Sequence, residues 1–374
     1  MRSPMSNDGS DGQAANHYVG VAISRDLEHS RRVLTDWFVA RCPQAGVIEV
    51  LSLKAPKAAG GSSETFFAAL KARVGGRLET QEYVLRINPR EYRLFLRDNF
   101  DEQYRLIRFL KEETDVPVPA IRFYEPDPSV FGSPFWIMDK VDGIVPPDNP
   151  PYTAGGWVFD GSPEQRRILW RSSIEALAKI ARLEPAHLPH VVVLAPGESG
   201  LDENLRHWTD SMMWACDGTP GTLNQEVNEW LWANRPARRE TGLSWGDARI
   251  GNMLFRDFEC VAVLDWEAIT LAGPQLDLAH WIFMEDYYTE CLGLPRLPGF
   301  GTRHETIALW EQLTGRTADQ MDWHELLAVF RININMARYI KLWSAAGRAN
   351  LVDDQGETLI SRHLRRVYAR VSKI

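Results

Sequence analysis

The chain has 374 residues, of which 44% are hydrophobic and 25% are charged, and its formal net charge is -8. This length exceeds what one hydrophobic core usually supports, so we expect two lobes, and the negative charge disfavours nucleic acid and anionic membranes as partners. No apolar run approaches the ~20 residues that would span a bilayer, and the 4 cysteines form no CxxC pair that would indicate a zinc site or a disulfide framework.

Residues 1–17 are mostly small and polar, and they contain no apolar segment of the kind found in a signal peptide. We therefore expect residues 1–30 to form a flexible N-terminal tail and the protein to be cytoplasmic. The first regular element that we expect after this tail is a short amphipathic helix over residues 34–40.

Residues 31–139 are expected to form a small N-terminal lobe that is mostly β. Its expected strands cover residues 47–53, 65–70, 83–87 and 135–138, where apolar and β-branched residues gather between turn signals. One long helix is expected over residues 101–113, where the apolar period becomes helical. The helix ends before a Val-Pro-Val-Pro sequence, because proline cannot continue a helix.

Residues 140–374 are expected to form a larger and mainly helical C-terminal lobe. Ser162, followed by Pro163 and by Gln165 three positions after the serine, is a capping box that should begin a helix. The helical pattern breaks into short strands and loops between residues 243 and 264, and helices resume from Gln275.

This interruption of the helical pattern contains the motif that predicts a catalytic function. Asp247 is followed five residues later by Asn252, and Asp265 follows a short apolar run, which is the arrangement of kinases. Phosphoryl transfer from ATP needs a carboxylate that orients the attacking hydroxyl and oxygen ligands that hold Mg²⁺ against the phosphates. The alternative is that Asp247 and Asn252 are turn residues beside glycines and that Asp265 ends a strand.

In these residues the sequence resembles the aminoglycoside phosphotransferase and choline kinase-like family, and within it the kinase-like domains fused to acyl-CoA dehydrogenases. The resemblance lies in residues 243–255, 263–267 and 273–279 and extends over about residues 47–343. It implies an α+β, protein-kinase-like two-lobed fold and an ATP- and Mg²⁺-dependent phosphotransferase that acts on a hydroxyl of a small molecule. By the same resemblance Asp247 would be the catalytic base, Asn252 and Asp265 the magnesium ligands, and Asp277 a buried support of the catalytic loop.

The resemblance also places the nucleotide. Arg249 would meet the transferring phosphate, although a solvated loop arginine is an equally fair interpretation. The turn that covers the nucleotide would be Gly60, Gly61, Ser62 and Ser63, unless this is an ordinary hairpin turn. At the hinge, the Asp139 C=O and the Val141 N–H would meet the adenine edge, with Met138 behind it.

Three residues depart from the family pattern. Trp245 stands where histidine is usual, and we expect it to keep a packing role that holds the loop. Arg86 stands where lysine is usual, and Gln103 stands where its glutamate partner is usual. Because a guanidinium is a wide fork, this is not a neutral change at a phosphate site, but Arg86 can still deliver charge and Gln103 can still accept a hydrogen bond from it.

The motif does not identify the acceptor, which would be chosen by helices within about residues 201–232 and 275–343. The family implies either an aminoglycoside or a hydroxyacyl-type metabolite. The mixture of aromatic and basic residues there slightly favours a less cationic, partly apolar acceptor. The alternative function is a pseudokinase-like nucleotide-binding or scaffold protein without transferase activity, which Arg86 and Gln103 support. The sequence determines neither the oligomeric state nor whether GTP can replace ATP.

Overall fold

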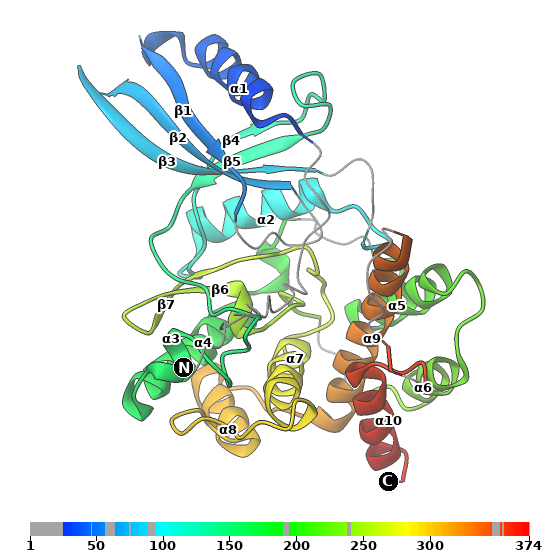
Figure 1. Cartoon of the computed structure of the whole chain (residues 1–374). Helices are drawn as coiled ribbons and strands as arrows, with labels where there is room; N and C mark the ends of the chain where they lie inside the picture. Colours follow the sequence, from blue (N-terminus) through cyan, green and yellow to red (C-terminus); the bar gives the residue numbers. More distant parts are fainter. Residues whose placement is uncertain are drawn as a thin grey trace, which may run out of the picture.

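The structure is a computed structural model, and it describes residues 25–45, 47–56, 64–74, 76–88, 94–189, 194–237, 241–345, 352–353 and 355–373. A small β-rich lobe lies above a larger helical lobe, as the sequence predicts (Figure 1). The β-rich lobe is built on an antiparallel sheet with the strand order β1-β2-β3-β5-β4. Its strands are β1 (Ile48–Lys54), β2 (Glu64–Val74), β3 (Arg77–Ile87), β4 (Ile121–Glu125) and β5 (Phe135–Asp139).

The two faces of the sheet are covered by different helices. Helix α1 (Leu27–Arg41) packs on one face, where Phe135 and Ile137 of β5 join its hydrophobic cluster. Helix α2 (Phe100–Glu113) lies on the other face, where Phe100 stacks on Trp136 with ring centroids 3.9 Å apart. Because side chains alternate across a strand, one short buried strand serves both hydrophobic layers.

The first helix begins earlier than the sequence pattern indicates. The predicted helix covers residues 34–40, whereas α1 starts at Leu27 behind the N-cap Asp26. The Asp26 carboxylate accepts hydrogen bonds from two backbone N–H groups of the first turn, which stabilises a helix start in which few residues are buried.

The hairpin of β2 and β3 is also longer than predicted. The pairing continues in register from Ile87 to Arg77, far beyond the predicted strand at 83–87. The extra residues of β3, 77–82, are exposed and, apart from Leu78, polar. They pair with β2 through backbone hydrogen bonds. Because such pairing does not require buried apolar side chains, the sequence shows no alternation of apolar and polar residues that would reveal it.

The second lobe is mainly helical. Its helices are α3 (Trp157–Asp160), α4 (Pro163–Ala181), α5 (Gly200–Ala215), α6 (Thr222–Ala233), α7 (Gln275–Asp286), α8 (Arg303–Thr314), α9 (Met321–Ala345) and α10 (Leu359–Val371). The capping box at Ser162 is confirmed, with Pro163 in the first turn of α4. The predicted interruption contains the short hairpin β6 (Met253–Arg256) and β7 (Glu259–Val263), which lies between the sheet and α7 (Figure 1).

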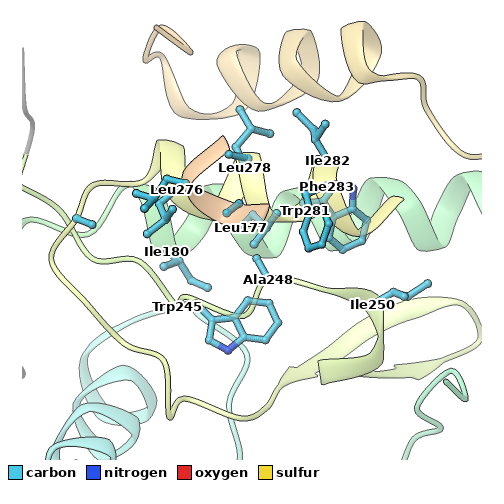
Figure 2. Close-up of a cluster of buried hydrophobic side chains, with 14 of the residues drawn as sticks. Leu177, Ile180, Trp245, Ala248, Ile250, Leu276, Leu278, Trp281, Ile282 and Phe283 are labelled. Atoms are coloured by element: carbon cyan, nitrogen blue, oxygen red, sulfur yellow. The ribbon is translucent and has the colours of Figure 1, made fainter. Parts of the chain in front are cut away.

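The loop before β6 rests on the hydrophobic core of this lobe. Trp245 and Ala248 lie beside side chains of α7, with α4 behind them (Figure 2), and Ile250 belongs to the same hydrophobic cluster. Trp245 and Ala248 are completely buried. None of the described helices combines the length and apolar composition needed to cross a bilayer.

Candidate active site

The backbone of the loop at residues 244–247 is fixed by a buried carboxylate. Asp277, in the first turn of α7, accepts hydrogen bonds from the Trp245 and Gly246 N–H groups, both at 2.7 Å. From the opposite side of this backbone, the buried Arg331 of α9 donates to the Gly246 carbonyl at 2.8 Å. Burial raises the pKa of Asp277 to about 7, although the two backbone donors lower it. Asp277 thus anchors the loop at residues 244–247, which is the supporting role that the family resemblance implies.

Gly246 is the residue at which the loop makes its tightest approach. Its φ is +91°, a left-handed value that glycine tolerates far better than other residues. A Cβ atom there would lie 1.9 Å from the Ala268 carbonyl oxygen. The close passage of the two chain segments therefore requires glycine immediately before Asp247.

The Asp247 carboxylate is held by donors on both oxygens. Oδ2 accepts from the Asn252 amide at 2.7 Å, and Arg249 Nε lies 3.4 Å from the same oxygen. Oδ1 lies 3.0 Å from His280 Nε2. Burial raises the pKa of Asp247, but Arg249, His280 and Asn252 outweigh it and hold that pKa well below its usual range. Asp247 is therefore an ionised acceptor at neutral pH.

Trp245 joins this loop to the segment that contains Asp265. Its indole N–H donates to the backbone carbonyls of Leu264 and Asp265, at 2.8 and 2.9 Å. Asp265 itself has a positive φ of +56°, which is uncommon for a residue with a side chain. The tryptophan thus does more than pack, because it fixes the backbone turn at the second predicted metal ligand.

A third carboxylate, Glu267, lies close to the first two. Burial and the Asp265 carboxylate raise the pKa of Glu267 well above its usual range, Asp247 raises it further, and Arg86 lowers it. Like charges that share a site favour protonation of one member. Glu267 on this wall of the site therefore favours its protonated form, and a bound cation would relieve the repulsion and favour the ionised form.

Arg86 reaches this wall from β3. Its guanidinium lies 3.5 Å from Asp265 Oδ1 and 5.8 Å from the centroid of the Trp136 ring. The expected hydrogen bond from Arg86 to Gln103 is not formed, because Gln103 Oε1 is buried and accepts no hydrogen bond from the described residues. Arg86 still delivers its charge to the site, and it does so by direct approach to Asp265.

The Gln103 amide belongs instead to a neutral relay. Gln103 Nε2 donates to Asn99 Oδ1, and Asn99 Nδ2 donates to the Glu267 backbone carbonyl, both at 2.8 Å. Helix α2 is thereby bonded to the segment of residues 265–267 without an ion pair. The sequence gives no indication of this relay, because Asn99 and Glu267 are 168 residues apart.

Arg249 is held by an additional carboxylate. Its Nη1 donates to both oxygens of Asp148, at 2.9 and 3.1 Å, and Tyr288 donates to Asp148 Oδ1 at 2.5 Å. A Cβ atom at Gly251 would lie 2.3 Å from Arg249 Nη1, so this glycine leaves room for the ion pair. Asp148 is a site residue that the sequence patterns do not indicate, whereas Tyr288 is one of the aromatic residues expected on the acceptor side.

The predicted hinge residues lie at the end of β5 and just beyond it. Met138 is buried and pairs with Val84 of β3, and the Asp139 N–H donates to the Ala120 carbonyl at 2.9 Å. Val141 follows in the connection between the lobes and is half-buried. Gly60, Gly61, Ser62 and Ser63 lie outside the described residues.

The residues present fit a magnesium ion. Asn252 directs its amide nitrogen to Asp247, which leaves its amide oxygen for another partner. Asp265 Oδ1 is buried and receives no hydrogen bond from the described part of the chain. An amide oxygen and a carboxylate, completed by phosphate oxygens and water, are donors that Mg²⁺ prefers. No group of three His, Cys, Asp or Glu residues suited to a metal occurs among the described residues.

The sequence analysis missed His280 altogether. It lies three residues after Asp277 on α7, and residues three apart share a helix face. The spacing alone could have placed the imidazole beside the loop that Asp277 anchors, but it could not show which loop atom the imidazole meets.

Comparison with known proteins identifies the fold. A protein from Ralstonia eutropha jmp134 that is named as an aminoglycoside phosphotransferase superposes with a TM-score of 0.62 at 22% identity, covering 90% of this chain and 94% of that chain. A thermostable variant of aminoglycoside phosphotransferase APH(4)-Ia, in a ternary complex with AMP-PNP and hygromycin B, superposes with a TM-score of 0.53 at 14% identity, covering 84% of this chain and 94% of that chain. At these identities the likeness establishes the shared kinase-like fold.

The two-lobed fold is that of the kinase-like class of phosphotransferases. The chain belongs to the phosphotransferase enzyme family, whose model matches residues 57–292. Acyl-CoA dehydrogenase family member 11 of Homo sapiens is 28% identical over 263 residues, which cover 67% of this chain and 32% of that protein. Family member 10 of Mus musculus is 27% identical over 208 residues, which cover 54% of this chain and 18% of that protein. The chain thus spans about a third or less of these relatives.

Proposed function

We propose that this chain transfers the γ-phosphoryl group of ATP to a hydroxyl group of a small molecule. The observation that carries the proposal is the Asp247 carboxylate, ionised and held on both oxygens in a loop that Asp277 anchors. Its side chain is 23% exposed, so an acceptor can reach it. A carboxylate in this state orients an attacking hydroxyl and receives its proton as the bond to phosphorus forms.

The other residues take their roles from their positions around Asp247. When bound by Asn252 and Asp265, Mg²⁺ would neutralise phosphate charge. Arg86 contributes positive charge from β3, and Arg249 is assigned to the transferring phosphate because its guanidinium lies beside the Asp247 carboxylate.

The nucleotide is assigned to the space between the lobes. In this assignment the Asp139 C=O and Val141 N–H meet the adenine edge, Met138 lies behind it, and the turn of residues 60–63 covers the phosphates. Backbone groups perform most of this recognition, so the residue types at the hinge are weakly constrained.

A weakly cationic, partly apolar acceptor suits the second lobe better than a polycation. Glu285 is buried and accepts hydrogen bonds from Tyr152 at 2.6 Å and from Arg296 at 3.0 Å. Burial raises the pKa of Glu285 to about 7 and that of Asp286 to about 6. These carboxylates therefore interact with residues of the protein itself. An acceptor that carries its hydroxyl on an acyl thioester is consistent with relatives that are named acyl-CoA dehydrogenases.

A substrate screen tests the proposal. Purified protein with ATP and Mg²⁺ would be incubated with aminoglycosides, amino alcohols, sugars and hydroxyacyl thioesters, and ADP release would be measured. We expect release with at least one class, and Asp247→Asn should lower turnover by about 10²- to 10⁴-fold while ATP binding, measured by calorimetry, changes little. Release that is unaffected by Asp247→Asn would refute the role of Asp247.

The second candidate is a nucleotide-binding protein without transferase activity. Two features favour it: the direct approach of Arg86 to Asp265, and a Gln103 Oε1 that accepts no hydrogen bond from the described residues. Both change the usual environment of the nucleotide phosphates. The measurement that separates the two is slow ATP hydrolysis in the absence of any acceptor. A pure binder would show the same background rate with and without the Asp247→Asn substitution.

A further inference from the structure

The environment of His280 is unusual for a buried histidine. The side chain lies on α7 with its residue completely buried, and Nε2 is 3.0 Å from Asp247 Oδ1. The other ring nitrogen, Nδ1, is also buried and meets no hydrogen-bond partner within the described residues. The Phe283 ring stands at the edge of the imidazole, with centroids 5.9 Å apart and an interplanar angle of 78°.

The contact with Asp247 determines the direction of the hydrogen bond. An ionised carboxylate can only accept hydrogen bonds, so the proton must reside on His280 Nε2. The buried Nδ1 then keeps a bare lone pair. The contact therefore selects one tautomer of the ring.

The surroundings also keep the ring neutral. Burial lowers the pKa of His280, the contact with Asp247 opposes that shift, and the guanidinium groups of Arg331 and Arg249 lower the pKa further. These two arginines and Asp247 are the charged groups that act on the imidazole. A neutral donor can orient the carboxylate without cancelling its negative charge.

We propose that His280 is the positioning residue for the catalytic base, and that its Nε2–H fixes the plane of the Asp247 carboxylate for the incoming hydroxyl; this inference rests on the proposed function. Asn252 and Arg249 both contact Oδ2, but donors on one oxygen alone leave the carboxylate free to rotate about its Cβ–Cγ bond. A donor on Oδ1 removes that freedom. Such orientation of a reacting group lowers the barrier by pre-arranging its geometry.

Helix α7 therefore positions both the backbone before Asp247 and the carboxylate of Asp247. Asp277 binds the two N–H groups that precede Asp247, and His280, about one turn later on α7, binds the carboxylate. Because α7 is buried on nearly every side, these two contacts are held in a constant relation.

Two amide substitutions test the inference. In His280→Gln the side-chain nitrogen can occupy the place of Nε2, whereas in His280→Asn the shorter side chain can occupy only the place of Nδ1. Both place a neutral amide in the same buried space, so each is the control for the other. ADP release from Mg²⁺ and ATP, with water as acceptor, would be measured along with the KM for ATP.

We expect His280→Asn to lower kcat by about 10- to 100-fold, the usual scale for one lost hydrogen bond to a charged group, with the KM for ATP unchanged. His280→Gln should retain kcat within about threefold of the unsubstituted protein. Equal losses of kcat in both variants, or a change confined to the KM, would overturn the inference.

A second readout does not depend on turnover. The nitrogen resonances of ¹⁵N-histidine-labelled full-length protein should show a neutral His280 with its proton on Nε2 at pH 7, and Asp247→Asn should shift these resonances. A proton on Nδ1, or a doubly protonated ring, would refute the inference. Absence of Asp247-dependent ADP release from the unsubstituted protein would refute the proposed function instead, while the resonances still decide whether His280 donates to Asp247.

Discussion

Replacing Asp277 by asparagine tests the anchor of the catalytic loop with little change in side-chain volume. The carboxyl group accepts two backbone N–H groups at 2.7 Å. An asparagine oxygen can accept only one of them, and its NH₂ group would face the other donor. Loss of one hydrogen bond costs about 0.5–1.5 kcal/mol, and a buried unsatisfied N–H costs about 1–3 kcal/mol. We therefore expect the free energy of unfolding at pH 5 to fall by about 2–4 kcal/mol.

The difference between the two proteins should depend on pH with a definite sign. The pKa of Asp277 is about 7 in the folded protein and the ordinary pKa of this side chain is 3.8, so between these pH values the folded state holds a proton that the unfolded chain has released. Stability from this group is fully present below pH ~4 and is lost as the pH rises through ~7. Asparagine does not titrate. The advantage of the unsubstituted protein should therefore shrink between pH 5 and 8, by up to about 1.4 kcal/mol per pH unit.

Urea unfolding followed by tryptophan fluorescence at several pH values measures this difference. Asp210→Asn is the matched control, because Asp210 is exposed on α5. A difference that stays constant from pH 5 to 8 would contradict the raised pKa of Asp277. A difference below about 0.5 kcal/mol at pH 5, which is the range of ordinary surface substitutions, would contradict its role as an anchor.

Substitutions at two further residues test the connections between the lobes. Asn99→Ala removes the hydrogen bond to the Glu267 carbonyl. It should raise the Mg²⁺ concentration for half-maximal ADP release about 10-fold, as expected for a residue that supports a metal ligand. An unchanged Mg²⁺ requirement would show that the hydrogen bonds of Gln103 and Asn99 do not support the metal site. Arg86→Met should weaken ATP binding, measured by calorimetry, by about 10-fold or more, because a charge-assisted contact is lost, whereas Arg86→Lys keeps the charge near Asp265 and should lose less. Equal losses in the two Arg86 variants would show that stacking on Trp136, and not charge, is what the arginine contributes.

The parts of the fold that the sequence predicts well are those with local causes. The α4 start follows from a capping box whose members lie within four residues of one another. The strand β5 follows from a short buried apolar run. By contrast, the outer half of β3 is exposed on both faces, and β4 is only partly buried. These strands exist because their backbones pair with the neighbouring strands β2 and β5, and backbone pairing leaves little trace in composition.

The candidate site likewise has one part that local sequence patterns predict and another part that they do not. The spacing of Asp247, Asn252 and Asp265 is a property of one short segment of chain, and the hydrogen bond between Asp247 and Asn252 is present. The contacts from His280 and Asp148 come from elements 33 and 101 residues away along the chain. They depend on how α7 and the inter-lobe connection pack, which no local pattern encodes. The departures at Arg86 and Gln103 were visible in the sequence, but their new partners were not.

The indole of Trp245 offers a built-in spectroscopic reporter. Its N–H is bonded to the carbonyls of Leu264 and Asp265, so any shift of that backbone changes the electronic environment of the ring. In protein labelled with fluorotryptophan, the resonance of Trp245 can be assigned by its loss in Trp245→Phe. A titration with magnesium and nucleotide could then be followed at a single atom, although the chain contains 14 tryptophans.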